Sequence, residues 1–308
     1  MSGRNKNFYL VVFLVGAGIF FSVPFLPDKK LELTFCDVGQ GDAILIQQGE
    51  NQVLIDGGPS ANQLLECLAK VPPWDRRIEL VVLTHPDSDH LTGLIEVFKR
   101  FQVNQLVANS IVKESGLFWQ FYQEVLAEPD LVIYSPRAGD RIRLGKMEFL
   151  VLWPEERPGD SRLWKTQFPL PGQNGLGDQI TADSQMVSIL GAAAIGKTNE
   201  TSVVLKFSYG EFDALLTGDI GFDSEKKIDF PEVEVLKVPH HGSKYSTSDE
   251  LVRESSPELA VISVGRNSFG HPTDEVLNRL NEKGIKVKRT DEEGEIEIVT
   301  NGKSYWLK

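Results

Sequence analysis

The sequence predicts a layered α/β domain preceded by one transmembrane helix, and three observations support this prediction. Short apolar runs rich in β-branched residues alternate with segments whose apolar residues recur at helical spacing, as in α/β folds. Hairpin-like turns interrupt the alternation, which favours stacked layers over a regular parallel barrel. Residues 8–26 form an apolar run without a charge. The 308 residues, 41% of them hydrophobic and 25% charged, are enough for one large domain, which we place at residues 31–308.

The apolar run is expected to cross a membrane, with the transmembrane anchor at residues 8–27. A helix of this length, at about 1.5 Å per residue, spans a bilayer core of about 30 Å. Arg4 and Lys6 precede the run, so the positive-inside rule places residues 1–7 in the cytoplasm. A cleaved signal peptide is the alternative, but the run is long and no clear A-x-A site follows it. We therefore expect a single-pass protein of the cell membrane whose C-terminal domain is extracytoplasmic.

The predicted elements follow one another along the domain, with one interruption at residues 154–198. That stretch is rich in Pro, Gly, Asp and Gln and has no clear period, so we expect an insertion or lid there. Thr273 is a suitable N-cap and Gly284 a suitable stop for the last helix. The predicted strands are 30–35, 43–46, 52–55, 78–83, 104–109, 131–134, 141–144, 147–153, 202–207, 212–216, 233–238, 260–264, 286–289, 295–299 and 305–307, and the predicted helices are 62–69, 91–100, 116–126, 248–253 and 274–283.

Charge and cysteine content narrow the range of functions. The chain has 32 basic and 44 acidic residues, a net charge of −12, which excludes a generally basic nucleic-acid-binding surface and leaves room for a local patch or a metal-centred site. Cys36 and Cys67 do not have the spacing of a metal-ligand pair, and Cys36 lies in an apparent strand. We expect buried free thiols, with a disulfide as the alternative if the domain is extracytoplasmic.

The histidines indicate a metal site. A lone histidine is more often structural than a ligand, but here every histidine of the chain lies just after a predicted strand or at a strand-to-helix turn, most of them beside Gly or Asp. Such a distribution favours ligands over core residues. The five histidines are His85, His90, His240, His241 and His271.

The spacing around the first histidines suits two cations. His85 and Asp87, two residues apart in extended chain, project to the same side and can hold one cation. The pair at 89–90 lies near a predicted helix start, where it can bind a second cation. Asp219 follows a strand and could bridge both ions, and one histidine of the pair 240–241 would complete the shell. Two cations about 3.5–4 Å apart can clamp the oxygens of a phosphate.

Nine short motifs occur in order between residues 31 and 299. They are FCDVGQGDA (35–43), LIDGG (54–58), LTHPDSDHL (83–91), VLWP in part (151–154), NETSVVL (199–205), LLTGDI (215–220), LKVPHHGS (236–243), GHP (270–272) and RTDEEG (289–294). This series resembles the metallo-β-lactamase superfamily, whose signature after a strand is H-x-H-x-D-H. It is more closely similar to the C-terminal hydrolase domain of ComEC-type DNA-internalisation competence proteins.

The resemblance implies a four-layer αββα sandwich with metal at one edge of the paired sheets, and hydrolysis by water activated at the metal. Carried over by position, it implies one ion at His85, Asp87 and Asp219, and another at Asp89, His90, Asp219 and His241. Asp89 is thereby also part of the catalytic site. Asn199 falls where many members have a further histidine and is included among the candidate ligands. His240 is expected to contact a phosphate. Lys237 and His271 are candidates for binding the charge of the substrate or for protonating the leaving group.

The chain departs from the superfamily pattern in two ways. Asp87 stands where the signature has its second histidine, and Asn199 stands in place of another. Carboxylate and amide ligands are harder than imidazole, so Mn²⁺ or Mg²⁺ becomes an alternative to Zn²⁺, with one or two ions bound. The channel-forming membrane region of competence proteins is not found in this sequence, so we expect hydrolysis without DNA translocation.

These observations lead to one principal functional hypothesis and two alternatives. We expect a membrane-anchored, extracytoplasmic, metal-dependent phosphodiesterase, specifically a nuclease on DNA related to competence and DNA uptake. A phosphoesterase for another cell-envelope phosphodiester, such as teichoic acid decorations, is the second hypothesis, and the acidic net charge favours it. The third is a member without catalysis that binds DNA or a protein partner. The expected partners are therefore DNA or another phosphodiester, and the membrane.

Overall fold

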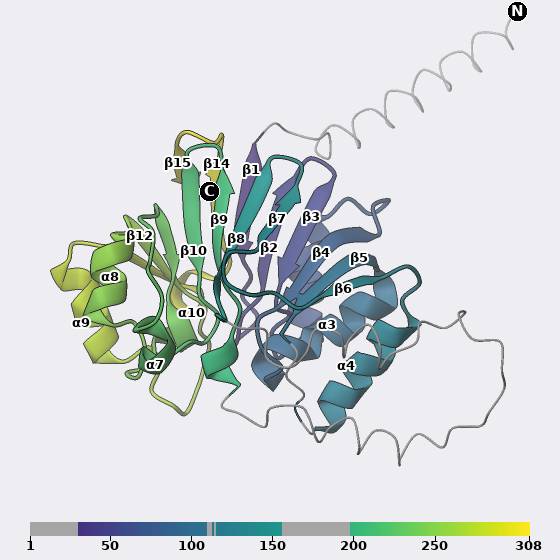
Figure 1. Ribbon diagram of the computed structural model, residues 1–308, viewed down its shortest axis with the longest axis horizontal. Helices are drawn as coiled ribbons and strands as arrows, with labels where there is room; N and C mark the ends of the chain where they lie inside the picture. The colour runs from purple at the N-terminus through teal and green to yellow at the C-terminus, as the bar shows by residue number, and fades with distance from the viewer. Residues whose placement is uncertain (1–29, 110–112, 114, 156–197) are drawn as a thin grey trace, which may run out of the picture.

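The computed structural model describes residues 30–109, 113, 115–155 and 198–308 (Figure 1). The expected cytoplasmic segment 1–7, the expected membrane span 8–27 and nearly all of the expected insertion or lid at 154–198 lie outside these residues. Among the helices of the described part, none has the length and apolarity needed to cross a membrane.

The first sheet contains eight strands: β1 (Leu31–Phe35), β2 (Ile44–Gln48), β3 (Asn51–Ile55), β4 (Arg77–Leu83), β5 (Gln102–Ala108), β6 (Val132–Tyr134), β14 (Ile296–Thr300) and β15 (Tyr305–Leu307). Their order is β15-β14-β1-β2-β3-β4-β5-β6. β1 pairs antiparallel with both β2 and β14, so residues 296–300 lie beside residues 31–35. β3 to β6 run parallel to one another, and their carboxyl ends therefore meet at one edge.

The second sheet contains seven strands: β7 (Arg141–Leu144), β8 (Met147–Trp153), β9 (Val204–Tyr209), β10 (Phe212–Leu216), β11 (Val235–Lys237), β12 (Leu259–Ile262) and β13 (Lys286–Arg289). Their order is β13-β12-β11-β10-β9-β8-β7. β7 to β10 are antiparallel to their neighbours, whereas β10 to β13 are parallel. This sheet also gathers the carboxyl ends of several strands at one edge.

Helices cover the outer face of each sheet, which gives four layers in the order αββα (Figure 1). α2 (Ala61–Cys67), α3 (Ser88–Arg100) and α4 (Gly116–Ala127) pack on the first sheet, and α8 (Asp249–Ser255) and α9 (Asp274–Glu282) pack on the second. The expected two-sheet α/β sandwich is confirmed. The short helices are η2 (Leu68–Lys70), η3 (Asn199–Thr201), α7 (Phe222–Glu225), η4 (Pro239–Gly242) and α10 (Thr290–Glu293).

The space between the two sheets is filled by apolar side chains from both. Phe35 on the first sheet and Phe149 and Phe207 on the second are fully buried there. The rings of Phe149 and Phe207 lie 5.0 Å apart between centroids. Each buried side chain of this size contributes about 1.5–3 kcal/mol. The two sheets are thus packed firmly against each other.

α3 begins at Ser88, three residues before the start predicted from its apolar spacing. Asp87 is its N-cap, and the Asp87 carbonyl accepts hydrogen bonds from His90 N (3.1 Å) and Leu91 N (3.0 Å). The prediction was wrong because the first turn is polar and carries no apolar signal. Asp89 and His90 therefore lie within the helix, where their direction is set by its first turn.

Glycines allow α3 to approach the loop after β3 closely. A Cβ on Gly93 would lie 2.0 Å from the carbonyl oxygen of Gly57, and a Cβ on Gly57 would lie 2.6 Å from Leu94 N. Any larger residue at either position would push the helix away. This close packing brings His90 to the loop that contains Asp56.

Smaller differences from the predicted elements have local causes. β9 begins at Val204, two residues later than predicted, because Ser202 N donates to Asn199 O (3.0 Å) at the end of η3. The RTDEEG motif (289–294), where no helix was predicted, contains the one-turn helix α10. Thr273 is the N-cap of α9 as predicted, but its side chain makes no capping hydrogen bond.

The expected free thiols are wrong, because Cys36 and Cys67 form a disulfide. Sequence spacing could not show that the end of β1 lies beside the end of α2. The bond ties the β1–β2 loop to that helix. A loop that contains Asp42, which faces the functional site described below, is thereby anchored.

Removing the disulfide is expected to lower the free energy of unfolding by about 2–4 kcal/mol, because the unfolded chain gains conformational entropy. The test is urea unfolding of a variant with Cys36→Ser and Cys67→Ser, compared with wild type. Adding a reductant to the double variant should cause no further change. Identical unfolding curves for reduced and oxidised wild type would contradict the prediction.

Candidate metal centre

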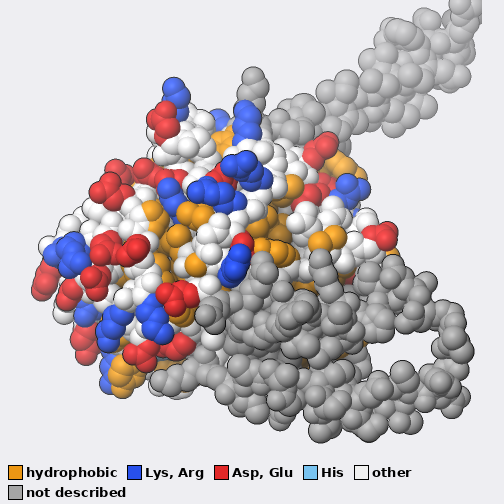
Figure 2. Space-filling model, viewed as in Figure 1, with side chains coloured by type: hydrophobic (Ala, Val, Ile, Leu, Met, Phe, Trp, Pro, Cys, Tyr) orange, Lys and Arg blue, Asp and Glu red, His pale blue; other side chains and the backbone are white. Residues whose placement is uncertain are grey.

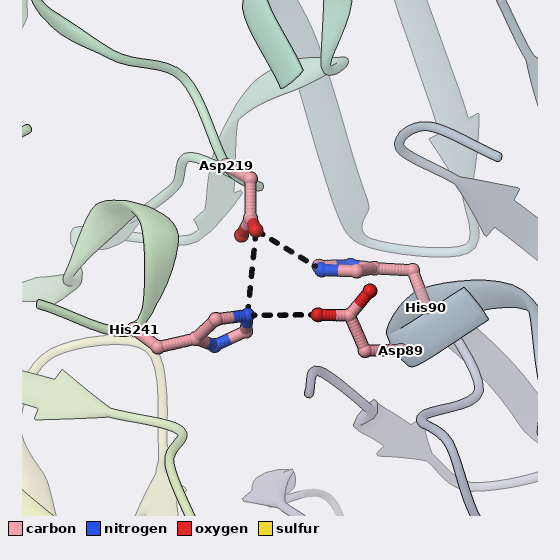
Figure 3. Close-up of side chains that lie close together, drawn as sticks. All are labelled: Asp89, His90, Asp219 and His241. Carbon is pink, nitrogen blue, oxygen red and sulfur yellow. Dashed lines mark ion pairs between the residues drawn. The ribbon is translucent and has the colours of Figure 1, made fainter. Parts of the chain in front are cut away.

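Four side chains from three segments converge at one edge of the sandwich, and we call them the metal cluster (Figure 3). Asp89 and His90 come from the first turn of α3. Asp219 follows β10, and His241 follows β11. One donor atom from each lies within 4.8 Å of the other three. Asp219 Oδ2 is 3.3 Å from both His90 Nε2 and His241 Nε2, and His241 Nε2 is 3.6 Å from Asp89 Oδ2.

The position of the metal cluster follows from the sheet topology. β4, β10 and β11 each end at this edge, and the carboxyl ends of parallel strands are where α/β folds place their functional loops. The first sheet supplies two ligands through α3, and the second supplies the other two. A site divided between two rigid sheets keeps its ligand spacing fixed.

The histidines of this edge have the hydrogen-bonding pattern of metal ligands. The Nε2 atoms of His85, His90 and His241 are buried and, within the described residues, have no hydrogen-bond partner. Their Nδ1 atoms are held: His90 by Asp56 Oδ2 (2.8 Å), and His241 by the Ser263 carbonyl (2.9 Å). A ring that donates from Nδ1 presents its Nε2 lone pair to a cation. The residues present therefore fit a divalent metal ion.

Asp56 lies in the LIDGG motif (54–58), and its contacts give it a role at the site that the motif alone did not assign. Its carboxylate is buried and accepts hydrogen bonds from Thr84 N (2.8 Å) and Thr84 Oγ1 (2.7 Å) as well as facing His90. Its backbone has φ 58°, a conformation that costs an L-residue about 1–2 kcal/mol. The signal available in the sequence was the Asp-Gly-Gly turn at a strand end.

The position of Lys237 does not fit the role expected for it, which was to bind the charge of the substrate or to protonate the leaving group. Its side chain is 1% exposed, its Nζ donates to Gly218 O (2.9 Å), and it pairs with the buried Asp42. Lys237 Nζ also lies 3.6 Å from Asp219 Oδ1. A substrate cannot reach an ammonium group in this position. Lys237 instead balances the charge of two buried carboxylates and positions Asp219.

The pKa values of the cluster reflect burial opposed by close charges. Burial alone would raise the pKa of Asp219, but His241 and His90 hold it well below its usual value. Burial, reinforced by the neighbouring His90, lowers the pKa of His85 to about 3, so this ring is neutral at neutral pH. Burial opposes charge on His90 as well, but Asp219 and Asp56 raise the pKa of His90 well above its usual value. A proton and a divalent cation therefore compete for these rings.

Of the residues expected around the other ion, Asp219 belongs to the metal cluster, whereas His85 and Asp87 do not, and neither does the candidate ligand Asn199. The ring of His85 lies 4.1 Å from that of His90, between centroids. Asp87 Oδ1 instead accepts from Thr198 Oγ1 (2.6 Å) and pairs with Lys113 (3.0 Å). Asn199 Nδ2 lies 3.3 Å from His240 Nε2. Within the described residues, these groups form a rim beside the cluster.

His240 joins the metal cluster to a pocket of about 600 Å³ that is also lined by His271. His240 Nε2 is 4.0 Å from Asp219 Oδ2, and its side chain is 30% exposed. Both His240 (φ 51°) and His241 (φ 54°) have left-handed backbone conformations, which non-glycine residues rarely adopt. Strained residues of this kind cluster at functional sites. The strain turns two successive rings in different directions, one toward the cluster and one toward the pocket.

The sequence profile of the metallo-beta-lactamase superfamily matches residues 36–266. The chain belongs to this superfamily. The matched range contains all four residues of the metal cluster as well as Asp56 and Lys237. The membership agrees with the αββα layers and with the place of the site at the edge of the paired sheets.

Curated relatives confirm the closer resemblance to ComEC-type competence proteins. The chain is 28% identical over 292 residues to ComE operon protein 3 of Bacillus subtilis, and this alignment covers 86% of this chain and 32% of that protein. It is 26% identical over 280 residues to competence protein ComA of Neisseria gonorrhoeae, and this alignment covers 89% of this chain and 33% of that protein. The chain thus spans about a third of the length of these relatives.

Solved structures of other proteins share the fold. YhfI from Bacillus subtilis, a metallo-beta-lactamase fold protein, aligns with TM-score 0.53 and 10% identity, covering 89% of this chain and all of that one. Igni18, a metallo hydrolase from Ignicoccus hospitalis, aligns with TM-score 0.50 and 14% identity, covering 86% of this chain and 98% of that one. At such low identity the likeness shows the fold alone.

Asp56→Asn is expected to weaken divalent metal binding by about 10- to 100-fold, because a neutral amide no longer fixes the orientation and basicity of His90. The measurement is a titration with Zn²⁺ and with Mn²⁺ against a chelating dye. Asp37→Asn is the matched control, since Asp37 lies in the β1–β2 loop and accepts from Gly39 N (3.4 Å). Unchanged affinity in a folded Asp56→Asn protein would refute the positioning role of Asp56.

Proposed function

We propose that this protein is a metal-dependent phosphodiesterase, and specifically a nuclease on DNA, held at the cell membrane with its catalytic domain outside the cytoplasm. The observation that carries the proposal is the metal cluster, in which buried imidazole nitrogens and carboxylates converge beside a pocket. Membership of the metallo-beta-lactamase superfamily supports hydrolysis. The competence proteins among the relatives support DNA as the substrate.

Asp89, His90, Asp219 and His241 would hold the catalytic ion, with His85 and Asp87 as candidates for a second. Two imidazoles and two carboxylates suit Zn²⁺ and Mn²⁺, and Mg²⁺ less well. A divalent ion supplies Lewis-acid activation of the phosphodiester and of water. Asp56 and Lys237 keep the ligands in position, through His90 and Asp219 respectively.

His240 and His271 are the groups placed to meet a substrate. His240 is partly exposed at the border between the metal cluster and the pocket, where its ring can contact a phosphate oxygen. Burial, together with the neighbouring His240, lowers the pKa of His271 to about 4. At neutral pH His271 is therefore uncharged and offers a substrate a hydrogen bond rather than a positive charge.

The charge distribution favours local recognition of the substrate. Figure 2 shows acidic and basic side chains interspersed over one face of the described part. With a net charge of −12, the chain would repel DNA at long range. Binding would then depend on the metal and on groups close to it. The same acidic charge keeps another envelope phosphodiester as the second candidate.

Two features support the extracytoplasmic location. The apolar run at 8–26, preceded by Arg4 and Lys6, has the length and charge pattern of a membrane anchor. The disulfide between Cys36 and Cys67 is of a kind that persists in oxidising compartments and is rare in the cytosol. The single anchor would keep the hydrolase close to the outer surface of the membrane.

The substrate class is tested by incubating the purified protein and Mn²⁺ or Zn²⁺ with single-stranded DNA, double-stranded DNA and bis-p-nitrophenyl phosphate. We expect cleavage of DNA and of the small diester. Cleavage of the diester but of neither DNA would exclude a nuclease and favour another envelope phosphodiester. No cleavage of any of them by fully metal-loaded protein would favour a binding protein without catalysis.

Asp219→Ala is expected to abolish this activity and to lower the bound metal, because Asp219 faces both histidines of the metal cluster. Metal content is measured by elemental analysis alongside the rate. Asp213→Ala is the matched control, since Asp213 lies on the same strand β10 and pairs with Lys206 (2.7 Å). An active and fully loaded Asp219→Ala protein would contradict the proposed site.

The topology is tested by protease treatment of intact cells whose outer layers have been removed. A tag at the C-terminus is expected to be digested, whereas a tag at the N-terminus is expected to be protected. The opposite pattern would show that the proposed orientation of the anchor is wrong.

A further inference from the structure

Two exposed aromatic rings lie at the pocket beside the metal cluster. Tyr245 is 66% exposed and Phe269 is 71% exposed, and both line this pocket of about 600 Å³. The other large apolar side chains exposed in the described residues, Trp74, Val132 and Trp306, do not line it. Aromatic side chains bury about 150–250 Å² each when they are covered. A ligand that covers both rings would therefore remove a large apolar area from water. The pocket is therefore suited to a flat apolar partner.

The ring of Phe269 already belongs to a stack that leads from the cluster. Phe269 and His271 are stacked, with centroids 5.7 Å apart and an interplanar angle of 29°. The His271 ring in turn lies 5.7 Å from that of His240, whose Nε2 is 4.0 Å from Asp219 Oδ2. A further flat ring placed on the exposed face of Phe269 would extend this series.

The loop that carries Phe269 is held in shape by Asn267. Asn267 Oδ1 accepts from Phe269 N (3.0 Å) and His271 N (3.1 Å), and Asn267 Nδ2 donates to Gly265 O (2.9 Å) and His271 O (2.8 Å). The segment with Tyr245 is fixed through its backbone, since the Tyr245 carbonyl accepts from Phe222 N (3.0 Å). Exposed rings on fixed backbones lose little conformational freedom when a ligand covers them.

Charged groups around the pocket suit the polar parts of a nucleotide. Lys244 lies over the Tyr245 ring, with Nζ 5.1 Å from its centroid, and can meet a phosphate. Asp274 and Glu275 line the same pocket and can accept hydrogen bonds from exocyclic amino groups. A volume of about 600 Å³ lies within the range of small-molecule sites.

From these observations we infer that the pocket binds an unpaired nucleobase, stacked on Phe269 and Tyr245, from a DNA strand whose phosphate lies at the metal cluster. The inference rests on the proposed function and narrows it to single-stranded DNA. Stacking on aromatic side chains accepts every base, because each has a π-face. A base within a duplex would first have to leave its stack, which costs a few kcal/mol.

The test compares two single strands of equal length, an oligothymidylate and a strand in which abasic residues replace all bases. The full chain, purified in mild detergent and loaded with the metal that supports cleavage, is assayed for kcat/KM on both. Wild type is expected to cleave the oligothymidylate at least about 10-fold more efficiently. Equal efficiency on the two strands would overturn the inference.

Phe269→Leu and Tyr245→Leu are each expected to lower kcat/KM on the oligothymidylate by about 10-fold and on the abasic strand by less than about 2-fold. This difference separates stacking from a structural effect, which would lower both. Trp74→Leu is the matched control, because Trp74 is 63% exposed in the loop before β4, at the other end of that strand from His85. An equal loss on both strands in Phe269→Leu would overturn the inference.

A binding measurement distinguishes a failure of this inference from a failure of the proposed function. Fluorescence anisotropy of labelled strands on the inactive Asp219→Ala chain is expected to show at least about 10-fold tighter binding of the oligothymidylate than of the abasic strand. Phe269→Leu in that background should remove the difference. If wild type cleaves no phosphodiester but this difference in binding is found, the nuclease proposal fails and the base pocket stands. Equal binding of both strands, or preferential binding of a glycerol-phosphate polymer, would overturn the base pocket.

Discussion

The buried carboxylate of Asp219 is the constraint on which the rest of the site depends. A carboxylate without water is costly unless cations or hydrogen bonds surround it. Asp219 is met by His90 and His241 on one oxygen and by Lys237 on the other side. These partners come from both sheets, so the charge can be satisfied only when the two halves of the sandwich are packed together.

Among the side chains buried at the site, negative charge exceeds positive charge. Asp42, Asp56 and Asp219 are buried and Asp89 is partly buried, whereas Lys237 is the one permanent cation that pairs with them among the described residues. The histidines can neutralise part of this excess negative charge by taking up protons. The raised pKa values of His90 and His241 favour this uptake. A divalent cation would neutralise the excess more completely and would release those protons. The fold thus has an electrostatic reason to bind metal, apart from any catalytic one.

Much of the fold could be predicted because its strands have strong local signals. β7, β8, β10, β13 and β15 have the predicted bounds, since alternating or continuous apolar residues between turn residues mark them clearly. The start of α3 was missed because Asp87, Ser88 and Asp89 carry no apolar period. The pairing of Cys36 with Cys67 depends on a contact between two elements, which no spacing rule reveals. Within the site, histidines after strands indicated the ligands, whereas the roles of Asp56 and Lys237 depend on hydrogen bonds between distant segments.

The pairing of β1 with β14 has a consequence for how the chain can be made. β1 lies inside the first sheet, yet one of its two neighbours consists of residues 296–300. During synthesis from the N-terminus, that side of β1 has no partner until nearly the whole chain has emerged. The exposed backbone groups of an unpaired strand are a template for pairing with other chains. Completion of the last hairpin therefore closes the sheet and ends the period in which a nascent chain is open to aggregation.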